Sequence, residues 1–279
     1  SSTLAIASGQ SVVFLDLCTG KQEAKADCSG GISRIAADVQ RHLQVAVALR
    51  GSVIVINTRG ERVGREIATP HSRALELCGQ SLASTELDDE NRWFVRIHNI
   101  VTGDLVHEIE HSRMLFSVFF SRDGTRLFTE DVNSLRVFSL ANSKAEQMAR
   151  IVVDTNAFAL FDRTDERLLL YLNNTRELRA WNSVDNSPPV PLFTFAPESR
   201  GVRRNMRTHH CIVLNADKLE LTDLRANGRS WKIKLPADDF DLHDSTVRAN
   251  WRFLVFTGMR SESPLTIIDF GADPLASKS

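Results

Sequence analysis

Short runs of β-branched and other apolar residues, each closed by one small polar residue, recur along the whole chain. The closing residues of the seven runs are Asp16, Asn57, Asn99, Ser139, Asn182, Asp223 and Asp269. They are separated by 41, 42, 40, 43, 41 and 46 residues. Side chains of Asp, Asn and Ser accept hydrogen bonds from the backbone N–H groups that follow them, so each can close the turn after a strand. The pattern therefore predicts a structural repeat of about 42 residues.

Each repeat contains further strands. One is predicted before the closing run, as at residues 4–7, 43–48, 168–171, 211–214 and 253–257. Another follows it, as at residues 63–67, 105–109, 192–195 and 231–235, and a fourth precedes this pair, as at 32–37 and 157–161. Four short strands in about 42 residues are typical of a propeller blade, and no long stretch has the 3.6-residue apolar period of a helix. We therefore expect an all-β, seven-bladed β-propeller of four-stranded antiparallel sheets, forming a single domain over residues 1–279.

The clearest repeat spans residues 111–144. Its strand at 118–121 is followed by an Arg-Asp-Gly-Thr turn, a strand at 127–129, Asp131, and a strand that ends in Phe138-Ser139. This order resembles the repeat of the WD-repeat family, with Phe138-Ser139 where that family has Trp-Asp. Trp181-Asn182 is the nearest match to that dipeptide elsewhere in the chain. The resemblance covers nearly the whole chain, although its motifs are degenerate.

The resemblance also assigns a role to one histidine. His71 and His111 lie 40 residues apart, each just after a predicted outer strand, where the family has its Gly-His dipeptide. In the family this histidine joins a buried hydrogen-bond chain. Carried over to this sequence, the chain would consist of His111, Thr129 and Asp131, and it would be shortened because Phe138 cannot donate a hydrogen bond.

The two ends of the sequence suggest how the ring closes. The first repeat begins at its second strand, and the seventh ends after its third strand, near Phe270. Ring closure normally pairs the two chain ends within one blade, which removes an exposed sheet edge. We therefore expect these 279 residues to be part of a longer chain. Strands from that chain or from a binding partner would complete the junction of the first and seventh blades.

Composition narrows the classes of partner. The net charge is −1, so the net charge does not indicate nucleic-acid or membrane binding, and a nucleic-acid contact would need a local patch. No apolar run reaches the roughly 18 residues of a membrane span. The four cysteines, Cys18, Cys28, Cys78 and Cys211, contain no CxxC pair and are read as small buried hydrophobes. That reading favours an intracellular protein, cytoplasmic or nuclear.

Two motifs suggest metal or catalytic chemistry, and neither fits the predicted strands. His107 to His111 matches H-E-x-x-H, but on a strand the two histidines would lie about 13 Å apart, too far for one zinc ion. His209, His210 and Cys211 are adjacent, so their side chains would alternate between two faces. We expect no metal, no cofactor and no catalytic residue. An enzyme site in a central channel remains an alternative. Its residues would come from separate blades, so they cannot be brought together from the sequence alone.

Two charged clusters remain as candidate binding sites. Arg200, Arg203, Arg204 and Arg207 could bind an anion, or they could be solvated and paired with Asp238, Asp239, Asp241 and Asp244. Glu86, Asp88, Asp89 and Glu90 form an acidic cluster in the third repeat's hairpin, which is expected to be exposed and either solvated or a docking site.

The leading hypothesis is a non-catalytic protein-interaction scaffold that presents its loop faces to other proteins within a larger complex. The alternative is a module that binds RNA, phosphoinositide or phosphopeptide through the arginine cluster.

Overall fold

The computed structural model describes most of the first two thirds of the chain in full and the strands of the remainder. The described residues are 3–38, 44–69, 72, 74–121, 123–152, 157–162, 167–172, 175–182, 187–194, 201–204, 210–214, 218–223, 230–234, 246–249, 253–257 and 266–269. In 157–167, at 169 and 171, and beyond 194, only the backbone is described.

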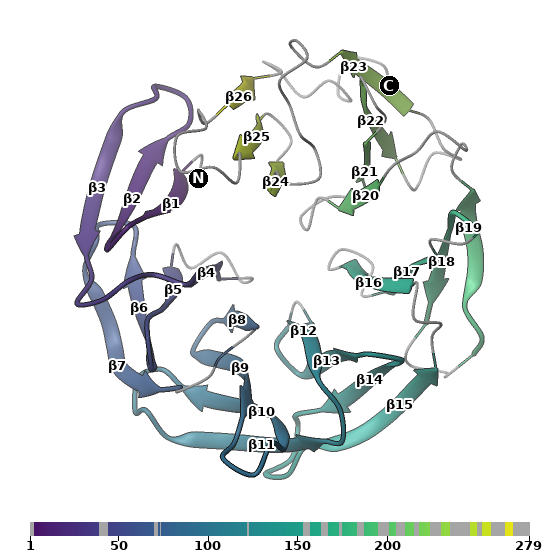
Figure 1. Ribbon diagram of the computed structural model, residues 1–279, viewed down its shortest axis with the longest axis horizontal. Helices are drawn as coiled ribbons and strands as arrows, with labels where there is room; N and C mark the ends of the chain where they lie inside the picture. Colours follow the sequence, from purple (N-terminus) through teal and green to yellow (C-terminus); the bar gives the residue numbers. More distant parts are fainter. Residues whose placement is uncertain are drawn as a thin grey trace. The chain divides into compact units, whose positions relative to one another are not determined.

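Every element of the described residues is a β-strand, and consecutive strands pair antiparallel into sheets (Figure 1). The first sheet contains β1 (Thr3–Ser8), β2 (Ser11–Asp16) and β3 (Gln22–Asp27). The second contains β4 (Arg34–Ala37), β5 (Gln44–Ala48), β6 (Ser52–Asn57) and β7 (Arg62–Ala68). The third contains β8 (Leu75–Cys78), β9 (Ser81–Leu87), β10 (Trp93–Asn99) and β11 (Leu105–His111). The fourth contains β12 (Leu115–Phe120), β13 (Arg126–Asp131), β14 (Ser134–Ser139) and β15 (Glu146–Val152).

The later strands continue the same pattern. The fifth sheet contains β16 (Ala157–Asp162), β17 (Arg167–Leu172), β18 (Glu177–Trp181) and β19 (Val190–Thr194). The sixth contains β20 (Gly201–Arg204), β21 (His210–Leu214), β22 (Lys218–Asp223) and β23 (Ser230–Lys234). The last contains β24 (Thr246–Ala249), β25 (Phe253–Thr257) and β26 (Thr266–Asp269). No helix able to cross a membrane occurs among the described residues.

The closing residues of the repeat mark strand ends, as the sequence predicts. Six of the seven are the last residue of a strand (β2, β6, β10, β14, β22 or β26), and Asn182 directly follows β18. The turn chemistry is also confirmed. Asp16 Oδ1 accepts from the Cys18 N–H at 2.7 Å, and Asn57 Oδ1 accepts from the Arg59 N–H at 2.9 Å. Asn99 Oδ1 accepts from the Val101 N–H at 2.8 Å.

The chain divides into two compact units, Ser1–Thr155 and Asn156–Ser279. The first unit holds β1 to β15 and the second holds β16 to β26. The first and last sheets have three described strands each, which fits a repeat that begins at its second strand and ends after its third. The seven-bladed single domain, and its completion by strands outside these 279 residues, remain predictions.

Within the first unit, neighbouring sheets pack face to face, and β5 shows why its sequence is apolar throughout. Val45 and Val47 pack with residues of the first sheet, whereas Ala46 and Ala48 pack with residues of the third. Because side chains alternate along a strand, a strand between two neighbours must be apolar on both faces. The same packing joins the third and fourth sheets through a further apolar cluster. The alternation that predicted strands thus also determines the stacking of the sheets.

Candidate functional site

Three strands that begin neighbouring sheets, β4, β8 and β12, are connected where they finish. β8 packs against both β4 and β12, and Asp38 forms a parallel bridge with Leu77. The Gly79 N–H donates to Asp38 Oδ1 at 2.9 Å, and the Cys78 thiol donates to the Ser121 carbonyl at 4.0 Å. These finishing ends, residues 38, 77–79 and 121, are called the tied end below. Their buried polar contacts hold the three strands in a fixed relation.

A pocket of about 350 Å³ lies where the same three strands begin. It is lined by Ser33, Arg34, Ser72, Met114, Leu115 and Phe116, which come from the starts of β4 and β12 and from the segment before β8. These six residues are called the pocket end below. The pocket lies between rigid strands, a placement that holds a binding site in a defined geometry.

A β-bulge in β12 exposes Phe116, the aromatic side chain among the described residues that line this pocket. Leu115 pairs with Asp131 and Ser117 pairs with Glu130, so Phe116 is the extra residue of β12. Bulges re-aim side chains and recur beside functional sites. Leu115 is only 1% exposed, whereas Phe116 is 49% exposed. The bulge therefore directs a large apolar ring to solvent while its neighbour stays in the core.

The hairpin between β13 and β14 contacts the residue that precedes Met114. Arg113 is exposed, and Val132 is exposed in this hairpin. With the Asn133 amide oriented to suit its neighbours, its oxygen accepts from Arg113 Nη1 at 2.9 Å, and its nitrogen donates to Asp131 Oδ1 at 3.3 Å. The hairpin therefore holds the side chain of the arginine next to a lining residue of the pocket.

Sequence reasoning did not identify this pocket. Ser33, Ser72 and Phe116 belong to three different repeats, and only the packing of the sheets brings them together. The one local signal is the Met-Leu-Phe triplet at 114–116. Successive side chains of a strand point to opposite faces, so an uninterrupted apolar triplet cannot place all three bulky side chains on one buried face.

The structure buries His111, Thr129 and Asp131 as expected, but it does not join them. Their exposures are 2%, 1% and 3%. Among the described residues, the two ring nitrogens of His111 and the Thr129 hydroxyl have no hydrogen-bond partner. The three side chains therefore do not form the hydrogen-bond chain that the family resemblance implies.

The reason is local competition for the Asp131 carboxylate. It accepts from the Ser134 hydroxyl at 2.6 Å and from the Ser134 N–H at 2.8 Å, and Arg136 Nη2 lies 3.3 Å away. His111 instead packs edge-on against Phe138, with ring centroids 5.8 Å apart. Burial and the nearby Arg136 lower the pKa of His111 to about 4, against an opposing effect of Asp131. At neutral pH this residue is an uncharged core side chain.

The H-E-x-x-H segment lies in β11, as a strand and not a helix. His107, Ile109 and His111 are buried, while Glu108 and Glu110 are exposed. Burial lowers the pKa of His107. The part of the chain whose side chains are described contains no cluster of three or more residues able to hold a metal ion.

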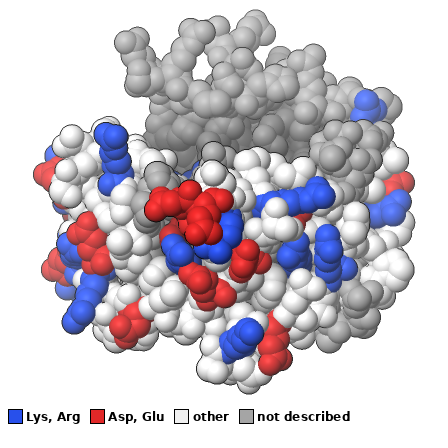
Figure 2. Space-filling model, turned by 60° about the horizontal axis from the view of Figure 1, so that its bottom comes forward, with Lys and Arg blue, Asp and Glu red and all other residues white. Residues whose placement is uncertain are grey.

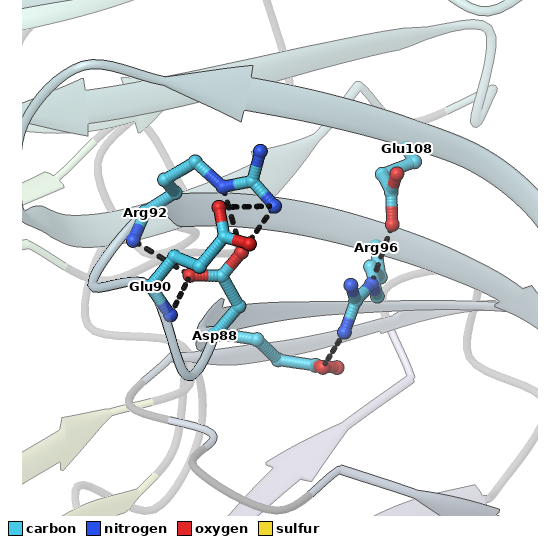
Figure 3. Close-up of polar contacts among 6 residues, drawn as sticks. Asp88, Glu90, Arg92, Arg96 and Glu108 are labelled. Carbon is cyan, nitrogen blue, oxygen red and sulfur yellow. Dashed lines mark hydrogen bonds and ion pairs between the residues drawn. The ribbon is translucent and has the colours of Figure 1, made fainter.

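The acidic cluster of the third repeat differs from the expectation because Glu86 is buried and Asp88 is only partly exposed. Glu86 is not exposed at the hairpin tip; its side chain is buried. It accepts from the Ser84 hydroxyl and from Arg96 Nη1, both at 2.7 Å. Arg96 Nε also donates to Glu108 Oε2 at 2.7 Å, as Figure 3 shows. Glu86 is therefore one end of an ion-pair chain across the third sheet, which runs from β9 through β10 to β11.

Asp88 closes the same hairpin through its own contacts. It accepts from the N–H groups of Glu90 and Arg92 at 3.0 and 2.8 Å, and Arg92 Nε donates to it at 2.8 Å. Partial burial opposes these bonds, which together lower the pKa of Asp88. Figure 2 shows acidic side chains gathered beside basic ones on the face that comes forward. The hairpin acids Asp88 and Glu90 are thus compensated within their own hairpin by Arg92.

The arginine cluster lies largely outside the described residues. Arg203 and Arg204 are in β20, where their backbones pair with Ile212 and Cys211, but their side chains are not described. Arg200 and Arg207 lie outside the described residues altogether. Anion binding by this cluster remains a prediction.

Antiparallel sheets that follow one another along the chain and pack face to face define a β-propeller, and solved structures agree. The chain is similar to the Cps50 (Swd1) β-propeller domain of Myceliophteria thermophila, with a TM-score of 0.69 and 13% identity over 97% of this chain and 94% of that one. It is similar to Raptor of Chaetomium thermophilum, with a TM-score of 0.69 and 13% identity over 92% of this chain and 26% of that one.

Hsv2 of Kluyvelomyces marxianus is a third similar structure, with a TM-score of 0.60 and 10% identity over 85% of this chain and 84% of that one. No protein-family model and no curated protein matches the chain. At these identities the similarity establishes the β-propeller fold and nothing more specific.

Proposed function

We propose that this chain is a non-catalytic protein-interaction scaffold of the WD-repeat type, and that its partners dock at the pocket end. The observation that carries the proposal is the exposed Phe116, presented by a bulge beside the half-buried Met114. Aromatic residues and methionine are enriched in protein–protein interfaces, and exposed apolar groups beside polar ones mark such surfaces. An anchor of this kind, fixed on a rigid strand, is the feature that a scaffold needs.

The charges near the pocket end favour an apolar anchor over bulk electrostatics. Arg92 forms ion pairs with both Asp88 and Glu90 within the hairpin of the third sheet. Pairs that are already satisfied contribute little to a new interface, because a partner would have to break them. We therefore expect partner binding to depend weakly on salt, in contrast to an anion-binding module, whose affinity falls steeply with salt.

The other features of the scaffold follow from the sequence and gain support from the structure. β1 is mostly half-buried, whereas its counterpart β5 is buried over four of five residues. A strand donated by a binding partner at the junction of the first and seventh blades is part of this proposal. Cys28 and Cys78 are buried, as the sequence predicts, whereas Cys18 is exposed and corrects that expectation. A cytoplasmic or nuclear protein working within a larger complex is part of the proposal.

Site-specific photo-crosslinking in cells tests the docking surface. A benzophenone amino acid replaces Phe116 in one variant and Val101 in the matched control. Both side chains are 49% exposed in the wild-type protein, but Val101 lies in the turn after β10, away from the pocket. We expect discrete protein adducts from position 116 that are absent from position 101. Equal adducts at both positions, or none at 116, would contradict docking at the pocket end. When the crosslinking is repeated in cell lysate, loss of the adducts with rising salt would favour the anion-binding alternative.

A further inference from the structure

We propose that the pocket end binds an extended peptide segment in which an acidic residue stands next to a bulky apolar residue. This inference rests on the proposed docking function and specifies the partner's chemistry. The pocket of about 350 Å³ is at the small end of ligand sites, which span roughly 300–1,000 Å³. That volume suits one bulky side chain and the groups that flank it.

The apolar wall selects the bulky side chain. Leu115 forms a fixed part of the wall because it is 1% exposed and belongs to the core. Phe116 offers a ring, and Met114 offers an adaptable thioether that accommodates several side-chain shapes. The wall therefore favours leucine, isoleucine, methionine or phenylalanine without strong preference among them.

The polar wall selects the carboxylate. Among the described residues that line the pocket, Arg34 is the only charged one and none is acidic. A guanidinium carries five N–H donors in a planar fork, so Arg34 can receive a carboxylate in addition to contacts that it already makes. The lining is therefore complementary in charge to a single acidic side chain.

The two serines select a peptide backbone. The Ser33 hydroxyl donates to the Ala48 carbonyl, and the Ser72 hydroxyl donates to the Ala74 carbonyl, both at 3.2 Å. Each hydroxyl has one proton, and it is used in these bonds, so only the oxygen lone pairs remain to face a ligand. Two acceptors beside a cation and an apolar wall match the N–H groups, carboxylate and apolar side chain of an extended peptide.

A polyanion fits this end of the unit less well. The hairpin between β9 and β10 places the exposed Asp89 and Glu90 at the same end of the third sheet as the start of β8. Like charges would face a nucleic acid or a long acidic tract there. The geometry thus points to a short motif with one acid and one apolar anchor.

Selection from a displayed library of random 12-residue peptides tests the proposal on the full chain. The peptides are joined at their C-termini to the display protein, so that no terminal carboxylate is offered. We expect enrichment of Asp or Glu within two positions of Leu, Ile, Met or Phe. The most enriched sequence, synthesised with an amidated C-terminus, then serves as the probe in fluorescence anisotropy. Arg34→Glu should weaken its binding about tenfold, and a repeated selection on that variant should enrich Lys or Arg in place of the acid.

Control variants separate failure of this inference from failure of the proposed function. Phe116→Ser should abolish the selection, whereas Val101→Ser should leave it unchanged, and circular dichroism confirms that each variant is folded. Peptides that need Phe116 but carry no acid, or that bind the Arg34→Glu variant equally well, would overturn the peptide chemistry and leave docking at the pocket intact. Enrichment that is indifferent to Phe116, or no enrichment at all, would overturn both the peptide chemistry and the pocket as its site.

Discussion

The two ends of β4, β8 and β12 differ in how neighbouring sheets are connected. At the tied end, bonds cross from sheet to sheet: the Gly79 N–H donates to Asp38, and the Cys78 thiol donates to the Ser121 carbonyl. At the pocket end, the serines bond locally: the Ser33 hydroxyl donates to the Ala48 carbonyl in its own sheet, and the Ser72 hydroxyl donates to the Ala74 carbonyl two residues later. Cohesion between sheets is thus concentrated at one end. The other end can carry binding residues without weakening the fold.

The largest expected effect is at Gly64, close to the tied end. Its φ is +73°, and a Cβ there would lie 2.0 Å from the Ile100 carbonyl oxygen in the neighbouring sheet. Gly64→Ala should lower the free energy of unfolding by about 3–5 kcal/mol, since a left-handed backbone and a backbone clash act together. Chemical denaturation followed by tryptophan fluorescence measures this loss.

Gly51 provides the matched control at the opposite ends of its strands, in the turn between β5 and β6. Its φ is +95°, but no atom lies within 4 Å of the Cβ position. Gly51→Ala should therefore cost only the conformational strain, about 1–2 kcal/mol. Equal losses for the two variants would show that contact between the second and third sheets at Gly64 adds nothing, and the contrast between the two ends would fail.

The second expected effect concerns pH and His111. Its pKa is lowered to about 4 in the folded protein, mainly by burial and then by Arg136, from an ordinary value of 6.5. The unfolded chain therefore binds a proton more readily than the folded chain between these values. The contribution of His111 to stability is complete above pH 6.5 and is lost as pH falls toward 4. The shift corresponds to about 3 kcal/mol over this window.

Denaturation curves at several pH values between 7 and 4 check this loss. His111→Leu removes the titrating group and keeps an apolar side chain against Phe138, so the slope of stability against pH in this window should become shallower. Asp131 contributes at lower pH, because its lowered pKa makes its stabilisation disappear only in more acidic solution. An unchanged slope in the His111→Leu variant would mean that His111 is not the group responsible.

What the sequence could predict follows the same division between local and distant contacts. The strand ends at Asp16, Asn57 and Asn99 were predictable because each side chain bonds to the backbone two residues later. The burial of His111 followed from the resemblance to the WD-repeat family, and so did the lack of a donor at Phe138. The loss of the bond to Asp131 was not predictable, because it depends on the bonds of Asp131 within its own hairpin.

Contacts between repeats explain the remaining differences. Glu86 looked like one more exposed acid of a hairpin, but Arg96 on the next strand and Ser84 on its own strand make it a buried acceptor. The pocket needed both the bulge at Phe116 and the packing of three sheets, and neither is written in a local pattern. Periodicity therefore predicted the fold, whereas the candidate site depended on where separate repeats meet.

The third and smallest expected effect concerns Asp38 and Ser33, which flank the two ends of β4. Asp38 is 2% exposed and accepts the Gly79 N–H across the sheet boundary. Asp38→Ala leaves that partly buried N–H without its acceptor, so the free energy of unfolding should fall by about 2 kcal/mol. Asp38→Asn keeps an oxygen acceptor and should cost less. Ser33→Ala removes an exposed hydroxyl that bonds within its own sheet, and it should change stability by less than about 0.5 kcal/mol. Thermal and denaturant unfolding of the three variants give the ranking. If Ser33→Ala proves as costly as Asp38→Ala, the pocket end is as important for cohesion as the tied end, and its residues are not free to serve binding alone.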